Sequence, residues 1–392
     1  MYDFTTILDR SNCGSSKWEL MKSKCKDIKG IAPLSVADME IQTAPEIKEC
    51  LKKAIDDTVL GYSMATPTYK DSIINWMDRH YNFKFEPEDI VSTASVVAGF
   101  FNAIRVLTEK NSGVVIMPPV YPPFFAAAKS NHRTLVECPL IENKGHYEIN
   151  FDLFDKLTQD PKNKTLLFCS PHNPVGRVWT LEELKKLGKI IIKNDVLLLA
   201  DEIHMDIVMP GYKHHVFETV LPELKDRTIT FTSTSKTFNL AGIALSNIII
   251  PNEELREKFV QGLQDAAAVP HQTLGFVATE CAYNHSEDWY KELLKLIDKN
   301  QHTVHEFFKE KFSQIKAPLL EGTYLMWIDF RALDMSCEEL EKFLDDKAKL
   351  FVNPGYTFGK EGEGFERINL ACPESTIKDA LNRLEKALKE IL

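Results

Sequence analysis

The sequence has none of the features of a chain that is exported or inserted in a membrane. No apolar run in its 392 residues reaches the roughly 18 residues of a membrane span. The N-terminus, Met1-Tyr-Asp-Phe-Thr-Thr6, lacks the basic stretch followed by an apolar one that a secretion signal requires. We therefore expect a cytoplasmic protein that is not processed and has no membrane partner.

Blocks of positive charge are also absent. The chain has 47 Lys and Arg residues against 57 Asp and Glu residues, and its formal net charge is −10. Nucleic acids and anionic lipid surfaces attract clustered basic side chains. The composition therefore argues against nucleic acid as a partner.

Cysteine patterns that indicate a zinc site are missing. The eight cysteines are scattered, at positions 13, 25, 50, 138, 169, 281, 337 and 372. They form no C-x-x-C pair and have no histidine at the spacing of a zinc site. We expect reduced thiols and no metal. The G-x-G-x-x-G pattern of dinucleotide-binding proteins is absent too, which argues against a nicotinamide enzyme.

What the sequence does contain, from about residue 90, is an alternation of short apolar runs with helical stretches. The predicted strands are Val114–Met117, Thr165–Cys169, Val196–Ala200, Ile229–Thr232 and Ala244–Ile250. Between them, Val97–Leu107 and Thr180–Lys193 have helical periodicity, and Thr180 with Glu183 makes a capping box. This alternation is typical of βαβ units, so it predicts an α/β domain with a mostly parallel sheet.

The two ends of the chain have a different character. Residues before Pro45 read as an extended arm, and Pro45–Thr58 and Tyr69–Tyr81 as amphipathic helices. After about residue 280 we expect a long helix, Ser286–Phe312, then strands and helices at Gly322–Phe330, Ser336–Leu344, Leu350–Val352, Arg367–Leu370 and from Ser375. The predicted organisation is an arm over residues 1–44 that joins the small domain, a large domain over 45–282 and a small α+β domain over 283–392.

A lysine among hydroxyl and small side chains follows one of the predicted strands, in Ser233-Thr-Ser-Lys236-Thr-Phe-Asn-Leu-Ala-Gly242. Most lysines are solvated surface charges, but an amine at a strand end can form a Schiff base with an aldehyde. Two upstream motifs favour this second interpretation: Ser170-Pro-His-Asn173-Pro-Val-Gly176 and Ala200-Asp201-Glu-Ile-His204. They stand in the order required by pyridoxal phosphate (PLP) enzymes of the aminotransferase-like fold.

PLP needs contacts to its ring. Asp201 ends a buried strand at the carboxyl edge of the sheet, where its carboxylate can keep the pyridine nitrogen protonated; the alternative is a helix cap. Asn173 can hold the ring hydroxyl oxygen, and His204 is a ring-edge contact or a satisfied polar group. Tyr121, between prolines, suits stacking on the ring, or is a packed loop aromatic.

The phosphate and the substrate carboxylate need donors. The free N–H groups of Ser95, Val96 and Val97 open an apolar helix and, with the Ser95 hydroxyl, suit an anion, although such a cluster is usually only a cap. The hydroxyls of Ser233 and Ser235 are also within reach. Arg367 starts a predicted strand and can bind a carboxylate with two parallel bonds, unless it is a surface residue.

The three motifs together resemble the fold-type I PLP enzymes of the class I/II aminotransferase family, which have the aspartate aminotransferase fold. Within that family they resemble the cystathionine β-lyase branch, the C–S lyases of the MalY/PatB type. The resemblance covers nearly the whole chain and also includes Val36-Ala-Asp-Met39, Gly61-Tyr62-Ser63, Pro119-Val-Tyr121, Asn353-Pro-Gly355 and the Arg367 segment.

The resemblance implies a role for each matching residue. Lys236 is the Schiff-base lysine, Asp201 the partner of the ring nitrogen, Asn173 the ring-oxygen contact and Tyr121 the stacking residue. The substrate carboxylate is bound by Arg367 and the Ala37 backbone. Tyr62 reaches into the neighbouring subunit's site in a homodimer with shared active sites. The implied reaction cleaves cystathionine or related cysteine S-conjugates to thiol, pyruvate and ammonia.

The chain departs from common aminotransferases at two positions: His204 stands where they have tyrosine, and Ala244 where they have an arginine that binds phosphate. Related lyases have Pro-Gly-Val-Val where this chain has residues 94–97, and tryptophan at Ser35. Two alternatives stay open. An aminotransferase would use the same residues, and a regulatory or binding protein could keep the fold. No second arginine for a dicarboxylate side chain is visible, which favours the lyase.

Overall fold

The computed structural model describes residues 2–25 and 28–392. The arm predicted over residues 1–44 therefore includes residues 1, 26 and 27, which lie outside the described part. Within that part, no helix has both the length and the apolar character needed to cross a membrane.

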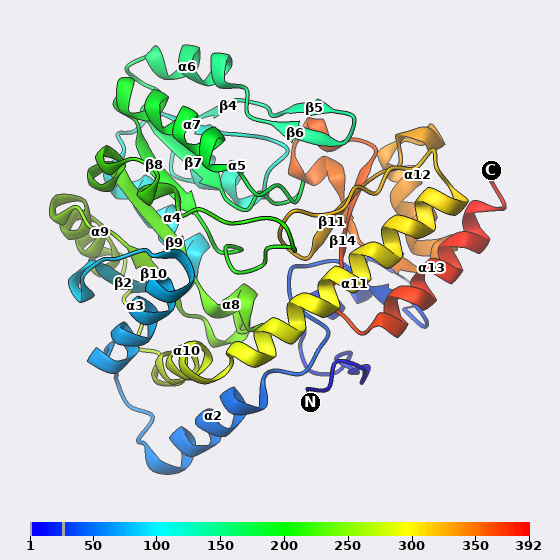
Figure 1. Ribbon diagram of the computed structural model, residues 1–392, viewed down its shortest axis with the longest axis horizontal. Helices are drawn as coiled ribbons and strands as arrows, with labels where there is room; N and C mark the ends of the chain where they lie inside the picture. Colours follow the sequence, from blue (N-terminus) through cyan, green and yellow to red (C-terminus); the bar gives the residue numbers. More distant parts are fainter. Residues whose placement is uncertain (1, 26–27) are drawn as a thin grey trace.

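A seven-stranded sheet lies in the left half of the molecule as drawn in Figure 1, and its strands follow the order β2-β10-β9-β8-β7-β3-β4. Its strands are β2 (Ile90–Thr93), β3 (Gly113–Ile116), β4 (Thr134–Glu137), β7 (Thr165–Cys169), β8 (Leu197–Asp201), β9 (Thr228–Thr232) and β10 (Ser246–Ile249). The predicted, mostly parallel sheet is confirmed. Only β10 runs antiparallel to its neighbours, β9 and β2. The sequence patterns missed β2 and β4.

Helices cover both faces of this sheet. Alternate residues of β7 and β8 point to opposite sides: Leu166 and Leu198 join one apolar cluster, Leu167 and Leu199 another. The first cluster packs under α6 (Phe151–Gln159) and α7 (Leu181–Lys193), the second under α4 (Val96–Leu107), α5 (Pro123–Ser130) and α9 (Glu253–Asp265). Because both faces are covered, these strands are unbroken apolar runs, and the carboxyl edge is left for polar residues.

The remaining helices form a second region beside the sheet. It contains α2 (Pro45–Asp57), α3 (Pro67–Tyr81) and α10 (Thr273–His285), followed by α11 (Glu287–Lys311), the long helix predicted from the sequence. These helices pack on one large apolar cluster that includes Trp76, Phe238 and Trp289.

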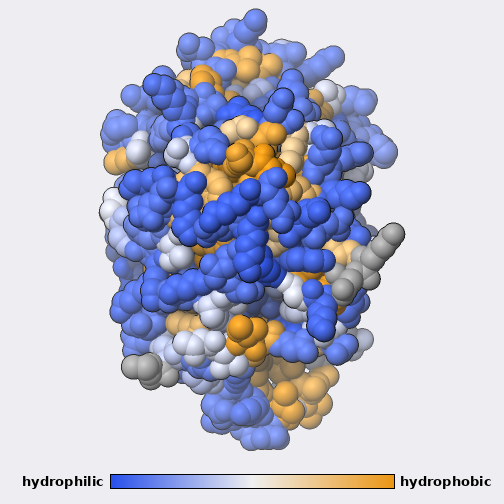
Figure 2. Space-filling view, turned by 90° about the vertical axis from the view of Figure 1, so that its right-hand side faces the viewer, coloured by the Kyte–Doolittle hydropathy of each residue, from blue (hydrophilic) through white to orange (hydrophobic). Residues whose placement is uncertain are grey.

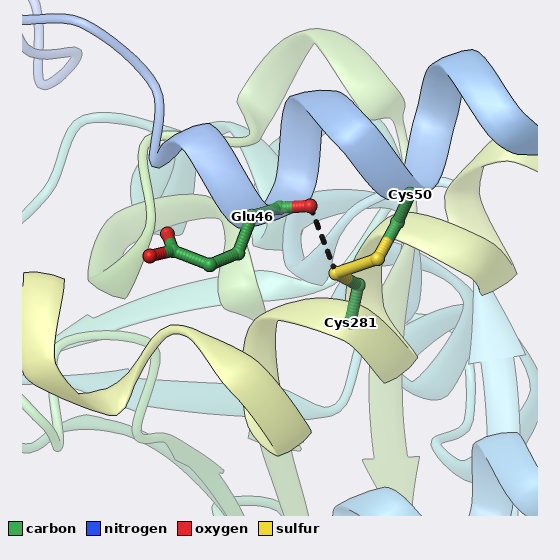
Figure 3. The surroundings of a disulfide bond; sticks show 3 residues. All are labelled: Glu46, Cys50 and Cys281. Carbon is green, nitrogen blue, oxygen red and sulfur yellow. Dashed lines mark hydrogen bonds between the residues drawn. A yellow bond between two sulfur atoms is a disulfide. The ribbon is translucent and has the colours of Figure 1, made fainter.

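A disulfide joins two of these helices, so the expectation that all eight cysteines are reduced thiols is wrong. Cys50 of α2 is bonded to Cys281 of α10, 231 residues later (Figure 3). The Cys281 sulfur also lies 3.3 Å from the Glu46 carbonyl oxygen. No local spacing pattern reveals a pair that only tertiary packing brings together. The other six cysteines are free.

The C-terminal part contains a three-stranded sheet of β11 (Leu325–Asp329), β14 (Phe365–Asn369) and β13 (Asn353–Pro354). The predicted helix from Ser336 is α12 (Cys337–Lys342), which continues as a π-helical segment, Phe343–Ala348. The chain closes with α13 (Glu374–Leu388). A separate hairpin of β5 (Ile141–Asn143) and β6 (His146–Glu148) follows β4.

The N-terminal arm is not wholly extended as predicted, because it contains α1 (Ser16–Lys24). The helix was missed because its apolar residues do not recur on one face; only Lys17 and Met21 are buried. Beyond it, β1 (Ala32–Pro33) pairs in parallel with β12 (Leu350–Phe351). The arm thus adds a strand to the C-terminal part of the chain.

Candidate active site

The predicted functional residues meet at the carboxyl edge of the central sheet. Asp201 ends β8, and Lys236 lies on α8 (Thr234–Thr237), a single turn that begins directly after β9. The turn starts there because the Ser233 hydroxyl accepts a hydrogen bond from the Ser235 N–H at 3.1 Å. A cavity of about 170 Å³ opens between these segments.

Most of the predicted residues line this cavity. They are Ala37, Ser95, Val96, Val97, Tyr121, Asn173, Asp201, His204, Ser235 and Lys236. The structure also places seven lining residues that sequence reasoning did not select: Ala94, Cys169, Ile203, Ala241, Ala244, Leu245 and Ser246. All seven adjoin a motif or a strand end. Their mostly small or apolar side chains do not by themselves indicate a binding role in the sequence.

The amine of Lys236 points into the cavity. Its Nζ donates a hydrogen bond to the Ala37 carbonyl oxygen at 2.7 Å. Burial lowers the pKa of this amine to about 8, and the positive charge of Arg367 acts in the same direction. An amine with such a pKa is partly unprotonated near neutral pH, so it can act as a nucleophile or a base.

The Asp201 carboxylate faces the cavity from β8. Its Oδ1 accepts a hydrogen bond from the Ile203 N–H at 3.2 Å. Burial raises the pKa of this carboxyl to about 7, because it outweighs the stabilisation of the charge by the Ile203 N–H and by Lys236. A cationic group placed beside it, such as a protonated ring nitrogen, would supply that stabilisation.

Arg367 does not line the cavity but reaches it through Asn173. Its Nη1 donates to Asn173 Oδ1 at 2.8 Å and its Nη2 to Asn353 Oδ1 at 2.6 Å. The guanidinium lies 4.7 Å from the centre of the Phe358 ring. The Asn173 oxygen is thus occupied, and its amide nitrogen remains to donate elsewhere. Asn353 and Phe358 were not selected from the sequence as contacts.

The Arg367 cation lacks a counter-ion. The residue is 4% exposed, its Nε has no hydrogen-bond partner, and no carboxylate pairs with it among residues 2–25 and 28–392. Burial lowers the pKa of the guanidinium to about 10. A buried charge of this kind is costly unless it is paired, so the arrangement suits an anionic ligand such as a carboxylate.

The other end of the cavity offers neutral donors. The Ser95 hydroxyl caps α4 by accepting from the Ala98 N–H at 3.0 Å, which leaves the N–H groups of Val96 and Val97 at the start of the helix. Ser235 also lines the cavity, whereas Ser233 does not, because its hydroxyl donates to the Leu245 carbonyl oxygen at 3.0 Å. This end suits a phosphate held by neutral groups and a helix N-terminus.

His204 and Tyr121 line the cavity near its ring-binding residues. Burial holds the pKa of His204 well below its usual range, so the imidazole is neutral. Its Nδ1 is buried and has no partner within the described part of the chain. Burial also raises the pKa of Tyr121, which keeps its hydroxyl protonated.

Tyr62 is not in the cavity of its own chain. The side chain is 94% exposed, and its ring lies 5.3 Å from that of His271. The adjoining Ser63 hydroxyl accepts a hydrogen bond from Thr273 at 2.9 Å, which ties this segment to the start of α10.

The residues present fit PLP. They provide a carboxylate for the ring nitrogen, an amide for the ring oxygen, an aromatic ring, an amine for the aldehyde and a helix N-terminus for the phosphate. The orphaned polar atoms of Arg367 and His204 are donors or acceptors that a bound group would satisfy.

Comparisons with known proteins agree with this arrangement. Residues 30–384 match the model of the family described as aminotransferase class I and II. Cystathionine beta-lyase PatB of Bacillus subtilis is 34% identical over 383 residues, which cover 97% of this chain and 98% of that protein.

Solved structures are similar over the whole chain. Cystalysin from Treponema denticola, which contains a pyridoxal 5'-phosphate cofactor, is 49% identical, covers 100% of both chains and has a TM-score of 0.99. The PLP-bound C-S lyase from Staphylococcus hominis is 32% identical, with a TM-score of 0.92 over 99% of this chain and 98% of that one. The sequence, the fold and the cavity therefore agree that this chain belongs to the aminotransferase class I and II family.

Proposed function

We propose that this protein is a PLP-dependent carbon–sulfur β-lyase that cleaves cystathionine or related cysteine S-conjugates to thiol, pyruvate and ammonia. The observation that carries the proposal is the buried, unpaired Arg367 beside Asn173, in one site with the low-pKa amine of Lys236. The names of similar proteins, cystathionine beta-lyase and C-S lyase, support the reaction type.

PLP, when bound, supplies an electron-accepting ring that stabilises negative charge at the substrate Cα. Asp201 would hold the proton on the ring nitrogen, and Asn173 and Tyr121 would orient the ring. The Val96 and Val97 N–H groups, with Ser95 and Ser235, would hold the phosphate. His204 would contact the ring edge. Arg367 and the Ala37 backbone bind the amino-acid carboxylate, which places the Cα–H bond toward Lys236.

Lys236 Nζ takes the Cα proton. Its position within the cavity and its lowered pKa both suit a general base near neutral pH. The sulfur at Cβ takes a proton from Lys236 or from Tyr62 of the partner subunit and leaves as the thiol, and water hydrolyses the released three-carbon enamine to pyruvate and ammonia. Transfer of that proton to the sulfur makes the thiol a better leaving group than the bare thiolate.

A feature of the cavity favours elimination over transamination of dicarboxylic amino acids. Lys236 is the one basic side chain among the described cavity residues, apart from the neutral His204. The side-chain carboxylate of aspartate or glutamate would find no cation there, whereas the distal carboxylate of cystathionine has its own ammonium group on the same carbon. A neutral or sulfur-containing side chain needs none.

We propose a homodimer in which Tyr62 enters the neighbouring site. The segment that follows α2 exposes Val59, Leu60, Tyr62 and Met64, all more than half accessible. Figure 2 shows hydrophobic side chains at the lower end of the molecule, where Figure 1 places the end of α2. An exposed apolar patch of this kind is typical of an interface between subunits.

We also keep the division into an arm over residues 1–44, a large domain over 45–282 and a small domain over 283–392. The pairing of β1 with β12 supports it, since it ties the arm to the C-terminal part. We further propose that the small-molecule substrate is an amino acid and that the protein acts in the cytoplasm.

The test is incubation of the purified protein with cystathionine and, separately, with S-alkyl cysteines. Pyruvate, ammonia and free thiol are measured with and without an added keto acid, and Lys236→Ala serves as the inactive control. Equal amounts of the three products without a keto acid are expected. Transfer of the amino group to the added keto acid without release of thiol or ammonia would identify an aminotransferase instead, and bound cofactor without turnover would favour a regulatory protein.

A further inference from the structure

Asp206 is a buried carboxylate that lies outside the cavity. It is 3% exposed, and its side chain accepts three hydrogen bonds. Oδ1 accepts from Trp76 Nε1 at 3.0 Å and from the Tyr81 hydroxyl at 2.5 Å. Oδ2 accepts from the Thr237 hydroxyl at 2.5 Å. The Asp206 carbonyl oxygen accepts a fourth bond, from the Tyr290 hydroxyl at 2.6 Å.

All four donors are neutral groups. Burial, followed by the Asp206 charge itself, raises the pKa of Tyr81, and the same two causes raise that of Tyr290. Burial lowers the pKa of His80, the nearby histidine. A buried carboxylate held by neutral donors needs at least one donor at each oxygen, because its charge is costly to bury without them. The network therefore fixes the position of Asp206.

Thr237 connects this network to the reactive lysine. It follows Lys236 directly on α8, which is only four residues long. A single helical turn has little stability of its own, so its position depends on anchors. The Thr237 side chain is fully buried, and its hydroxyl makes one such anchor.

Asp206 is also close in sequence to the other reactive groups. Asp201 and His204 precede it on the same segment, which leaves the carboxyl end of β8. The hydrogen bond between Asp206 and Thr237 therefore joins the segment at the carboxyl end of β8, which contains Asp201 and His204, to α8, which contains the Lys236 amine. Trp76 and Tyr81 brace this junction from α3, and Tyr290 braces it from α11.

We propose that Asp206 is a positioning residue that acts through Thr237 to fix α8, and with it the Lys236 amine, relative to Asp201. The inference rests on the proposed function in so far as it concerns the cofactor. A displacement of about 1 Å at a reacting group can lower a rate on the order of 100-fold. Removal of the Thr237 anchor is therefore expected to affect the chemistry, although neither Thr237 nor Asp206 lines the cavity.

Two matched substitutions test this. Thr237→Val and Tyr81→Phe each remove one hydroxyl that donates to Asp206. Tyr81→Phe leaves Oδ1 with the Trp76 donor, whereas Thr237→Val leaves Oδ2 without a donor from the described residues. Thr237→Ser keeps the hydroxyl and is the conservative rescue. Asp206→Asn is the second variant if Thr237→Val does not fold.

Three measurements are made on each variant. The first is the pH titration of the visible absorbance of bound PLP, which reports the proton shared by the cofactor and Lys236. The second is kcat and KM separately. The third, which needs no cofactor, is hydrogen exchange of the peptide that contains residues 233–238.

The expected result is specific to Thr237→Val. Its absorbance midpoint shifts by about half a pH unit or more, kcat falls at least about 10-fold with KM little changed, and residues 233–238 exchange faster. Tyr81→Phe stays within about twofold of the wild type in kcat, and Thr237→Ser restores the wild-type titration. Equal changes in Thr237→Val and Tyr81→Phe, or none in either, would overturn the inference.

Failure of the proposed function gives a different pattern. A wild type that binds PLP but forms no pyruvate would remove the lyase assignment, and the titration and exchange measurements would still decide the role of Asp206. A wild type that binds no PLP would overturn the proposed function together with the role of Asp206 toward the cofactor.

Discussion

The substitution Arg367→Lys separates the charge of this residue from its geometry. Lysine keeps the positive charge but cannot form two parallel bonds to a carboxylate, nor bond Asn173 and Asn353 at once as the guanidinium does. A hydrogen bond to a charged group contributes about 1.5–3 kcal/mol. Since about 1.4 kcal/mol is a factor of ten, loss of one such bond lowers kcat/KM roughly 10- to 150-fold.

The assay is steady-state pyruvate formation at several substrate concentrations, with the cofactor content of each variant measured by absorbance. Arg331→Lys is the matched control, because this exposed arginine also lies over a ring, Phe365, at 4.5 Å. It is expected to behave like the wild type. If Arg367→Lys keeps kcat/KM within threefold of the wild type, two-pronged binding of the substrate carboxylate is refuted.

Three further predictions follow from the site and the fold. Burial raises the pKa of Asp201 from 3.8 to about 7 in the folded, cofactor-free protein. The contribution of this group to the free energy of unfolding is therefore complete below pH 3.8 and is lost as the pH rises to 7. Asp201→Asn should therefore abolish turnover yet flatten the pH dependence of cofactor-free unfolding between these values; an unchanged slope would contradict the shift. Cys50→Ser should lower the free energy of unfolding by about 2–4 kcal/mol in denaturant titrations, whereas Cys337→Ser, at a free cysteine, should not. Inactive Lys236→Ala and Tyr62→Ala proteins, once unfolded and refolded together, should regain up to about a quarter of wild-type activity, because half of the dimers then hold one intact site; no recovery would argue against shared sites.

The positions of Asp201 and Lys236 could be predicted because one ends a buried strand and the other lies just after one. Thr165–Cys169 was predicted with its bounds, and Asp201 and Lys236 stand just beyond apolar runs, so the parallel arrangement brings them to one edge. Hydroxyls were harder to interpret. Ser233 and Ser235 are two residues apart, yet only Ser235 lines the cavity, because local hydrogen bonding commits Ser233 to Leu245.

Contacts that depend on tertiary packing could not be predicted. Asn353 is 14 residues from Arg367 in sequence, and Asn173 is 194 residues away, yet both bond the same guanidinium. The Cys50–Cys281 bond and the Thr237–Asp206 bond are similar cases. The edge strands β2 and β4 were missed because each combines two adjacent apolar residues with two polar ones, so neither shows an apolar run or an alternating pattern.

Because Arg367 donates a hydrogen bond to Asn173, the side-chain amide of Asn173 lies beside the sites of both the substrate carboxylate and the cofactor ring. The amide oxygen faces the guanidinium that awaits a carboxylate, and the amide nitrogen is left for the ring oxygen. An inert carboxylic acid that occupies the arginine should therefore alter the yellow colour of the holoprotein without any chemical turnover. The visible absorbance of the holoprotein would then report ligand binding directly and could be used to screen for inhibitors.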